Sequence, residues 1–205
     1  MSHCRPISLS WKAAATATLV MLLSSCSDLA VSDTEIFGIA DLLVLSQQPN
    51  APAPASQNIW ISNSRQTIVR INHPDNFNTV YLELTFPAQS LASLNDAPLS
   101  ATDSVNVTID PRPGEYGFVL SPSGLEFSSE SAPGATFSFS VYGDASAGSA
   151  SSTYGSSTEY VAALDIWCEV AVDQWQIASG SGASGVDGVS ASVGSLGRFV
   201  LAAPR

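Results

Sequence analysis

Residues 80–86 have the sequence Val-Tyr-Leu-Glu-Leu-Thr-Phe, and this stretch indicates the fold class. Every second residue is apolar, from Val80 to Phe86. Successive side chains on a strand point to opposite faces, so a period of two predicts a strand with one buried face. We expect Tyr81, Glu83 and Thr85 to lie on the other face.

The same period recurs along the chain. It is found in Val105/Val107/Ile109, in Phe137/Phe139/Val141 and in Ile166/Cys168/Val170. Turns rich in Pro and Gly, at residues 110–114, 121–124 and 132–134, separate these stretches. We count about nine or ten short strands and little helix, which predicts an all-β fold, an antiparallel two-sheet β-sandwich of the Ig-like class.

The first 25 residues predict an export signal. Arg5 and Lys12 precede the apolar run 13–23, which at about 11 residues is shorter than the ~20 that span a bilayer. The run ends in Leu23-Ser24-Ser25-Cys26, which resembles the lipobox of bacterial lipoproteins. The resemblance implies that Cys26 becomes the new N-terminus and carries lipid, with a diacylglycerol and a palmitate, so that the protein is anchored to a membrane. A chance cysteine beside an ordinary signal peptide is the alternative.

The resemblance also bears on location, because Ser27 follows the cysteine. In the bacterial sorting rule an aspartate at that position favours the inner membrane, so Ser27 favours the outer membrane, on its periplasmic or surface side. We therefore expect a lipid-anchored protein of the cell envelope.

We expect three parts in the chain: the signal peptide over residues 1–25, an acylated N-terminus with a Pro/Ala-rich tether over residues 26–57, and the β-sandwich domain over residues 58–205. Residues 35–45 allow either a short helix, after the capping-box spacing from Ser32 to Glu35, or a first strand at 42–46. The run of Gly, Ser and Ala at 143–158 predicts a long exposed loop, and residues 179–188 predict a shorter one.

Charge and cysteine content narrow the function classes. After residue 25 the chain keeps all 18 acidic residues and five of its seven basic residues, which gives 5 − 18 = −13. Such a charge excludes nucleic acid as a partner, because phosphate contacts need clustered Lys and Arg. With Cys4 removed and Cys26 acylated, Cys168 is left alone and no intrachain disulfide forms.

Four stretches in the last 125 residues or so carry a family resemblance. Residues 84–91 (LTFPAQSL) form a strand ending in proline, a small residue and leucine, and residues 119–127 (VLSPSGLEF) form a strand, a turn and a returning strand. Residues 164–167 with Trp175, and then 197–201, provide a tryptophan hairpin and a closing strand. In this order they resemble the sandwich domain shared by ankyrins, netrin receptors and zonula occludens proteins, which implies that architecture and, for many members, protein binding.

Some members of that family cleave themselves at a His-Phe-Ser triplet. The comparable residues here are Arg198-Phe199-Val200, which lack both the histidine and the attacking hydroxyl, so self-cleavage is not implied.

No catalytic site is predicted. His73 is the only histidine after the signal and lies in a turn-like sequence, so we expect an exposed turn residue. Cys168 shares a strand face with Ile166 and should be a small buried residue, not a reactive thiol. Glu115 and Glu126 are expected to be solvated.

The remaining candidates are binding residues. Trp60 alternates with Ile59 and Ile61, so if those two residues point inward, Trp60 points outward and is then the first residue to test for contact with a partner. We expect the other two tryptophans of the domain, Trp167 and Trp175, to be core residues. The only cofactor considered is calcium, for which Asp75, Asn76 and Asn78 are candidate ligands and Asp187 is a lesser one, although neither group has the spacing of an EF-hand loop.

The sequence therefore predicts a membrane-anchored, exported lipoprotein that presents a non-catalytic β-sandwich for protein binding or envelope structure. A carbohydrate or cell-wall binding module is the alternative, and a hydrolase is the third reading.

Overall fold

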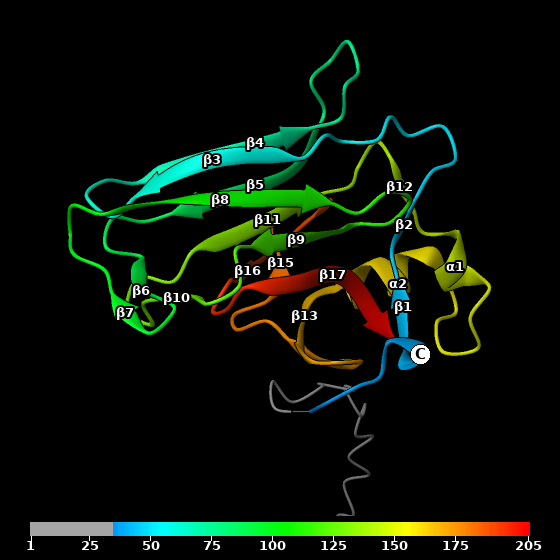
Figure 1. Ribbon diagram of the computed structural model, residues 1–205. Helices are drawn as coiled ribbons and strands as arrows, with labels where there is room; N and C mark the ends of the chain where they lie inside the picture. The colour runs from blue at the N-terminus through cyan, green and yellow to red at the C-terminus, as the bar shows by residue number, and fades with distance from the viewer. Residues whose placement is uncertain (1–34) are drawn as a thin grey trace, which may run out of the picture. The chain divides into compact units, whose positions relative to one another are not determined.

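The computed structural model describes residues 35–205, and strands dominate this part of the chain (Figure 1). The strands form two large antiparallel sheets and two small ones, which confirms the all-β prediction. The predicted signal peptide and Cys26 lie outside the described residues. Among residues 35–205, no helix has the length and apolar character needed to cross a bilayer.

The largest sheet contains β1 (Leu42–Val44), β3 (Gln57–Ser62), β8 (Ser104–Pro111), β9 (Gly117–Ser121), β13 (Asp165–Ala171), β14 (Gln174–Ile177) and β17 (Gly197–Pro204). Their order is β14-β13-β17-β9-β8-β3, with β1 beside β17. The second large sheet contains β4 (Thr67–Asn72), β5 (Val80–Phe86), β11 (Gly134–Ser138), β15 (Gly182–Ala183) and β16 (Gly188–Ser192). Their order is β15-β16-β11-β5-β4.

Shorter elements lie at the ends of these sheets. A three-stranded sheet is formed by β6 (Leu91–Leu94), β7 (Ala97–Pro98) and β10 (Leu125–Phe127), and a two-stranded one by β2 (Ser46–Gln47) and β12 (Gly143–Asp144). The helical elements are a 3-10 turn, η1 (Ile39–Asp41), and two short helices, α1 (Ser146–Ser149) and α2 (Ser157–Ala162).

The period-two residues form the core. Leu82, Leu84 and Phe86 of β5 are fully buried, and so are Val107 and Ile109 of β8. Side chains of both large sheets belong to one hydrophobic cluster, so the alternation correctly marked the faces that pack together.

Tyr81 is an exception to the alternation. It was expected on the outer face of its strand but is fully buried. The ladder shifts register here, because Ile71 pairs with Leu82 and Asn72 pairs with Val80, which leaves Tyr81 as the extra residue of a bulge. Its ring stacks on Tyr116 with centroids 5.1 Å apart, and its hydroxyl donates to the Gly117 carbonyl at 2.6 Å. Burial raises the pKa of this phenol.

Trp167 and Trp175 are buried, as predicted, but in a second cluster. This tryptophan cluster consists of Leu42, Trp167, Trp175, Ile177, Val200 and Ala202. Trp167 follows Ile166 on β13, so it lies on the opposite face of the sheet from the main core. The large sheet is therefore hydrophobic on both faces at this end.

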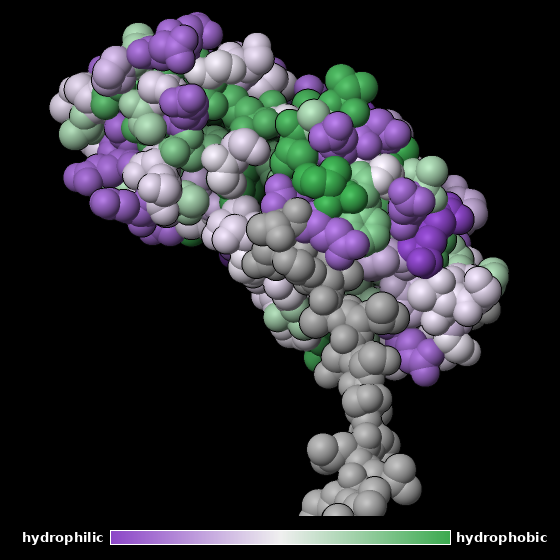
Figure 2. All heavy atoms as spheres, turned by 90° about the horizontal axis from the view of Figure 1, so that it is seen from below, coloured by the Kyte–Doolittle hydropathy of each residue, from purple (hydrophilic) through white to green (hydrophobic). Residues whose placement is uncertain are grey.

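The segment before β1 covers the tryptophan cluster. Phe37 and Trp175 exchange two backbone hydrogen bonds of 2.9 and 2.8 Å, and the Phe37 ring meets Trp167 edge-on with centroids 5.1 Å apart. Viewed from below, hydrophobic atoms gather near the middle of the visible face (Figure 2). Residues 35–41 thus act as a cover for an otherwise exposed apolar face.

The folded domain begins before residue 58, so the boundary assigned to the tether was wrong. Leu42 and Leu45 are buried, β1 pairs with β17, and the Leu45 N–H donates to the Leu201 carbonyl at 2.8 Å. Of the two alternatives for residues 35–45, the strand forms, preceded by one 3-10 turn. Its partner lies at the far end of the chain, so local sequence carries no signal for the pairing.

The expected long loop at 143–158 is partly ordered into β12, α1 and the start of α2. Its small residues permit close packing, because a Cβ on Gly148 would clash with the Tyr160 Cβ. Tyr160 is fully buried and donates a hydrogen bond to the Leu43 carbonyl at 3.0 Å. Low apolar content therefore did not prevent this segment from packing around one tyrosine.

Candidate functional site

Trp60 points outward, as its alternation with isoleucines predicted. Trp60 is 67% exposed, whereas the neighbouring Ile61 is fully buried. It lies on β3, the last strand of the largest sheet, opposite Asn106 of β8. An indole this exposed, held on a strand and not on a loop, is a rigid apolar platform for a partner.

Polar side chains surround the indole. Asn58 lies two positions away on the same face, and its Oδ1 accepts a hydrogen bond from the Thr108 hydroxyl at 2.5 Å. Ser62 lies on the other side of Trp60, and Asn106 is exposed. An apolar platform framed by amides and hydroxyls can pack on a protein side chain or stack on a sugar ring.

The β3 strand has an open edge. The Asn63 N–H donates to the Asp103 carbonyl at 2.8 Å, which continues the ladder to β8 by one position. Because antiparallel residues alternate between bonded and non-bonded positions, the backbone groups of Asn58, Trp60 and Ser62 point away from β8. Trp60 therefore offers both its ring and its backbone at the edge.

Other long edges of the described sheets are covered or interrupted. Phe37 bonds to the outer side of β14. Strand β4 carries the Arg70–Glu83 ion pair, and its Arg70 carbonyl accepts a hydrogen bond from the Gln57 side-chain amide at 3.3 Å. Bulges, charged side chains and prolines usually protect an exposed strand edge. The β3 strand has none of these, because its register is regular and it contains no charged residue and no proline.

The candidate calcium ligands lie in the hairpin between β4 and β5. The Asp75 carboxylate accepts bonds from the Thr79 hydroxyl and N–H, the Phe77 N–H and the Tyr142 hydroxyl. These bonds, led by that from the Thr79 side chain, lower the pKa of Asp75 to about 2. Asn76 and Asn78 are exposed. In residues 35–205 no three His, Cys, Asp or Glu side chains gather to hold a metal ion, and calcium binding here stays a prediction.

His73 is buried, so the expectation of an exposed turn residue was wrong. Its Nδ1 lies 2.7 Å from the Pro52 carbonyl, and its ring centroid lies 4.5 Å from that of Tyr142 and 5.4 Å from that of Tyr81. The Nε2 atom finds no hydrogen-bond partner among the described residues. The histidine therefore holds the proline-rich stretch against the hairpin, an arrangement that the local sequence did not reveal.

Cys168 is partly buried on β13, and burial raises the pKa of its thiol. A thiol with a raised pKa is a poor nucleophile at neutral pH. This agrees with the interpretation of Cys168 as a packing residue.

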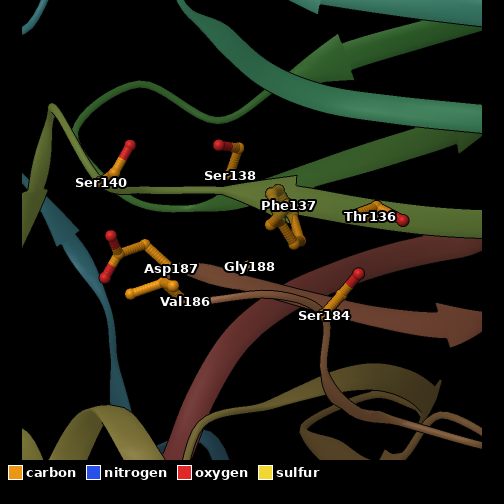
Figure 3. Close-up of a pocket in the computed structure, with 8 residues that line it drawn as sticks. All are labelled: Thr136, Phe137, Ser138, Ser140, Ser184, Val186, Asp187 and Gly188. Atoms are coloured by element: carbon orange, nitrogen blue, oxygen red, sulfur yellow. The ribbon is translucent and has the colours of Figure 1, made fainter.

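A polar hollow of about 290 Å³ was not anticipated (Figure 3). It is lined by Thr136, Phe137, Ser138, Ser140, Ser184, Val186, Asp187 and Gly188. Figure 3 shows the hydroxyls of β11 and the residues after it on one side, and Asp187 on the segment before β16 on the other. Hydroxyls and a carboxylate suit a small ligand rich in hydroxyl groups. The two sides lie about 50 positions apart in the sequence, and no local motif marks them.

The exposed Trp60 and the open edge of β3 form the candidate site with the clearest geometry, and the hollow beside Asp187 is a second, polar one. Neither a protein-family model, nor a curated protein, nor a solved structure matches this chain.

Proposed function

We propose that this chain is an exported lipoprotein of the cell envelope, anchored through Cys26 and favouring the outer membrane. Its domain is an Ig-like, two-sheet β-sandwich that acts without catalysis by binding a protein partner through the surface around Trp60. The observation that carries the proposal is the 67% exposure of this tryptophan on an open strand edge.

The edge favours a protein over other partners. Unpaired N–H and C=O groups alternate along β3, and an added polypeptide strand is the ligand that matches such a row. The indole supplies the apolar contact beside it, and interface energy concentrates in residues of this kind.

Carbohydrate binding is the second candidate. It is favoured by the amides and hydroxyls around Trp60 and by the hollow lined with hydroxyls and the Asp187 carboxylate. If the natural chain binds a glycan array and the Trp60→Ala or Asp187→Asn variant loses that binding, the ligand is a sugar and not a protein.

Anchoring is tested by Cys26→Ser. Removal of the sulfur leaves no atom for the lipid, so the protein should move from the membrane fraction to the soluble fraction when a bacterial host is fractionated. Ser25→Ala, which keeps a small residue before the cysteine, should stay in the membrane. A Cys26→Ser protein that remains membrane-bound would contradict the lipoprotein assignment.

Partner binding is tested by crosslinking in cells with the membrane-bound chain, followed by mass spectrometry. A partner should be captured by the natural chain and reduced at least about tenfold by Trp60→Ala, since truncating a hot-spot aromatic typically costs more than about 2 kcal/mol. Val172→Ala is the matched control, because Val172 is 93% exposed but lies beyond β13, away from β3. Equal capture by both variants would exclude the Trp60 surface.

A further inference from the structure

We propose that the partner at this edge is a second copy of the chain. Two β3 strands pair antiparallel, so that the largest sheets of two molecules join across a two-fold axis at Trp60. This inference rests on the proposed function, because it uses the same surface.

The backbone groups of β3 set the register of the pair. Asn58, Trp60 and Ser62 are the residues whose N–H and C=O groups point to the open edge. When Trp60 lies opposite Trp60 of the second copy, Asn58 lies opposite Ser62, and all three residues bond. This gives three pairs that each exchange two backbone hydrogen bonds. If the register places Trp60 opposite Asn58, only two such pairs form within β3.

The side chains are compatible with the same register. The two indoles lie directly opposite on one face, and aromatic cross-strand pairs are among the favourable ones. The two Asn58–Ser62 pairs that flank them are small and polar. No charged side chain of β3 meets its own copy, because the strand Gln-Asn-Ile-Trp-Ile-Ser has none.

The wider charge distribution also favours this edge for self-association. The chain carries 18 acidic and seven basic residues, so two copies repel each other over most orientations. Beside β3, however, two arginines, Arg65 and Arg70, accompany the acidic Asp103 and Glu83. Opposite charges balance at this corner, and two copies meet there with little like-charge repulsion.

Exposed apolar side chains are also found on the strand that follows β3 and on the hairpin after it. Ile68 on β4 is 53% exposed, and Phe77 in the following hairpin is 88% exposed. That hairpin projects past the end of β4 (Figure 1). Trp60 and Ile68 lie on the outer faces of the two different sheets, and Phe77 lies in the hairpin between β4 and β5.

The pairing is tested with cysteines in the full chain on the membrane of a bacterial host. One copy carries Asn58→Cys, a second carries Ser62→Cys, and both carry Cys168→Ala to remove the native thiol. Bonded antiparallel pairs have Cα atoms about 5.5 Å apart, within the range of a disulfide. We therefore expect a mixed disulfide dimer when the two variants are expressed together.

Each variant expressed alone is the control. In the proposed register two Asn58 residues lie four positions apart along the strand, about 14 Å, which is too far for a disulfide. Dimers that form equally in the mixed and the single samples would reveal random collision and overturn the pairing. The absence of a mixed dimer would overturn it as well.

A proline variant gives an independent measurement. Asn58→Pro removes an N–H that points to the open edge and leaves the ladder to β8 intact. Sedimentation of the full chain in detergent should show dimerisation at least about tenfold weaker, because two inter-chain bonds are lost by symmetry. Asn58→Ala loses the same Thr108 contact but keeps the N–H and should dimerise nearly as the natural chain does. Equal effects of the two variants would contradict edge pairing.

The outcomes separate the two proposals. If no mixed dimer forms but another protein is captured in a Trp60-dependent way, the partner is not a second copy and the proposed function stands. If the mixed dimer forms and no other protein is captured, the chain's partner is itself. If neither is found, the Trp60 surface is not a protein-binding site.

Discussion

A chain that begins at Asn58 is expected not to fold, whereas a chain that begins at Val31 is expected to unfold in one cooperative transition. The shorter chain lacks the buried Leu42 and Leu45 and the Phe37 cover over Trp167. Burial of each large apolar side chain contributes about 1.5–3 kcal/mol, and a whole domain is stable by only about 5–15 kcal/mol. Loss of the three side chains together with the β1 ladder removes most of the free energy that stabilises the folded domain.

Circular dichroism and thermal unfolding of the two chains measure this effect. Leu45→Ala in the longer chain is the graded control, and it should lower the free energy of unfolding by about 2–5 kcal/mol without abolishing the fold. Equal thermal midpoints for the chains that begin at Val31 and Asn58 would mean that residues 35–57 are a tether after all.

Trp167→Ala should lower the free energy of unfolding by about 3–5 kcal/mol. The indole is fully buried, packs against Phe37, and donates its N–H to the Ala202 carbonyl at 3.0 Å. Truncation leaves a large cavity and removes the hydrogen bond from the indole to the Ala202 carbonyl. Trp60→Ala is the matched control, because the same substitution at an exposed position should change stability by less than about 0.5 kcal/mol.

Urea unfolding followed by far-UV circular dichroism compares the two tryptophan variants without relying on indole fluorescence. The difference between the urea midpoints of the two variants measures how much the tryptophan cluster contributes to the stability of the domain. Similar stabilities for Trp167→Ala and Trp60→Ala would show that the second cluster contributes little, and that the domain depends on the main core alone.

Local patterns in the sequence predicted the strands that face the main core. Strands β5, β8 and β13 form where the period-two stretches occur, and their inward residues, such as Leu84 and Val107, are buried. The outward direction of Trp60 followed from the same rule. These features depend on neighbours one or two positions away, which is the range over which alternation carries information.

Features that depend on distant partners were not predicted. Tyr81 turns inward because of a bulge in its ladder to β4, and His73 is buried by three tyrosines and Pro52. In the segment compared with a strand, turn and returning strand, β9 and β10 both form, but β10 pairs with β6 instead of β9. The edge at β3 likewise became evident only from the strand order.

The pairing of β1 with β17 joins the first and last strands of the domain, and the Arg205 N–H donates to the Asp41 carbonyl at 2.8 Å. The largest sheet cannot form completely until β17 has been synthesised, and pairing over such a separation is slow to form. During synthesis the domain therefore lacks a complete hydrophobic core. If the chain is exported as we propose, this delay would keep the polypeptide unfolded during passage through a translocation channel, and folding would be completed on the far side.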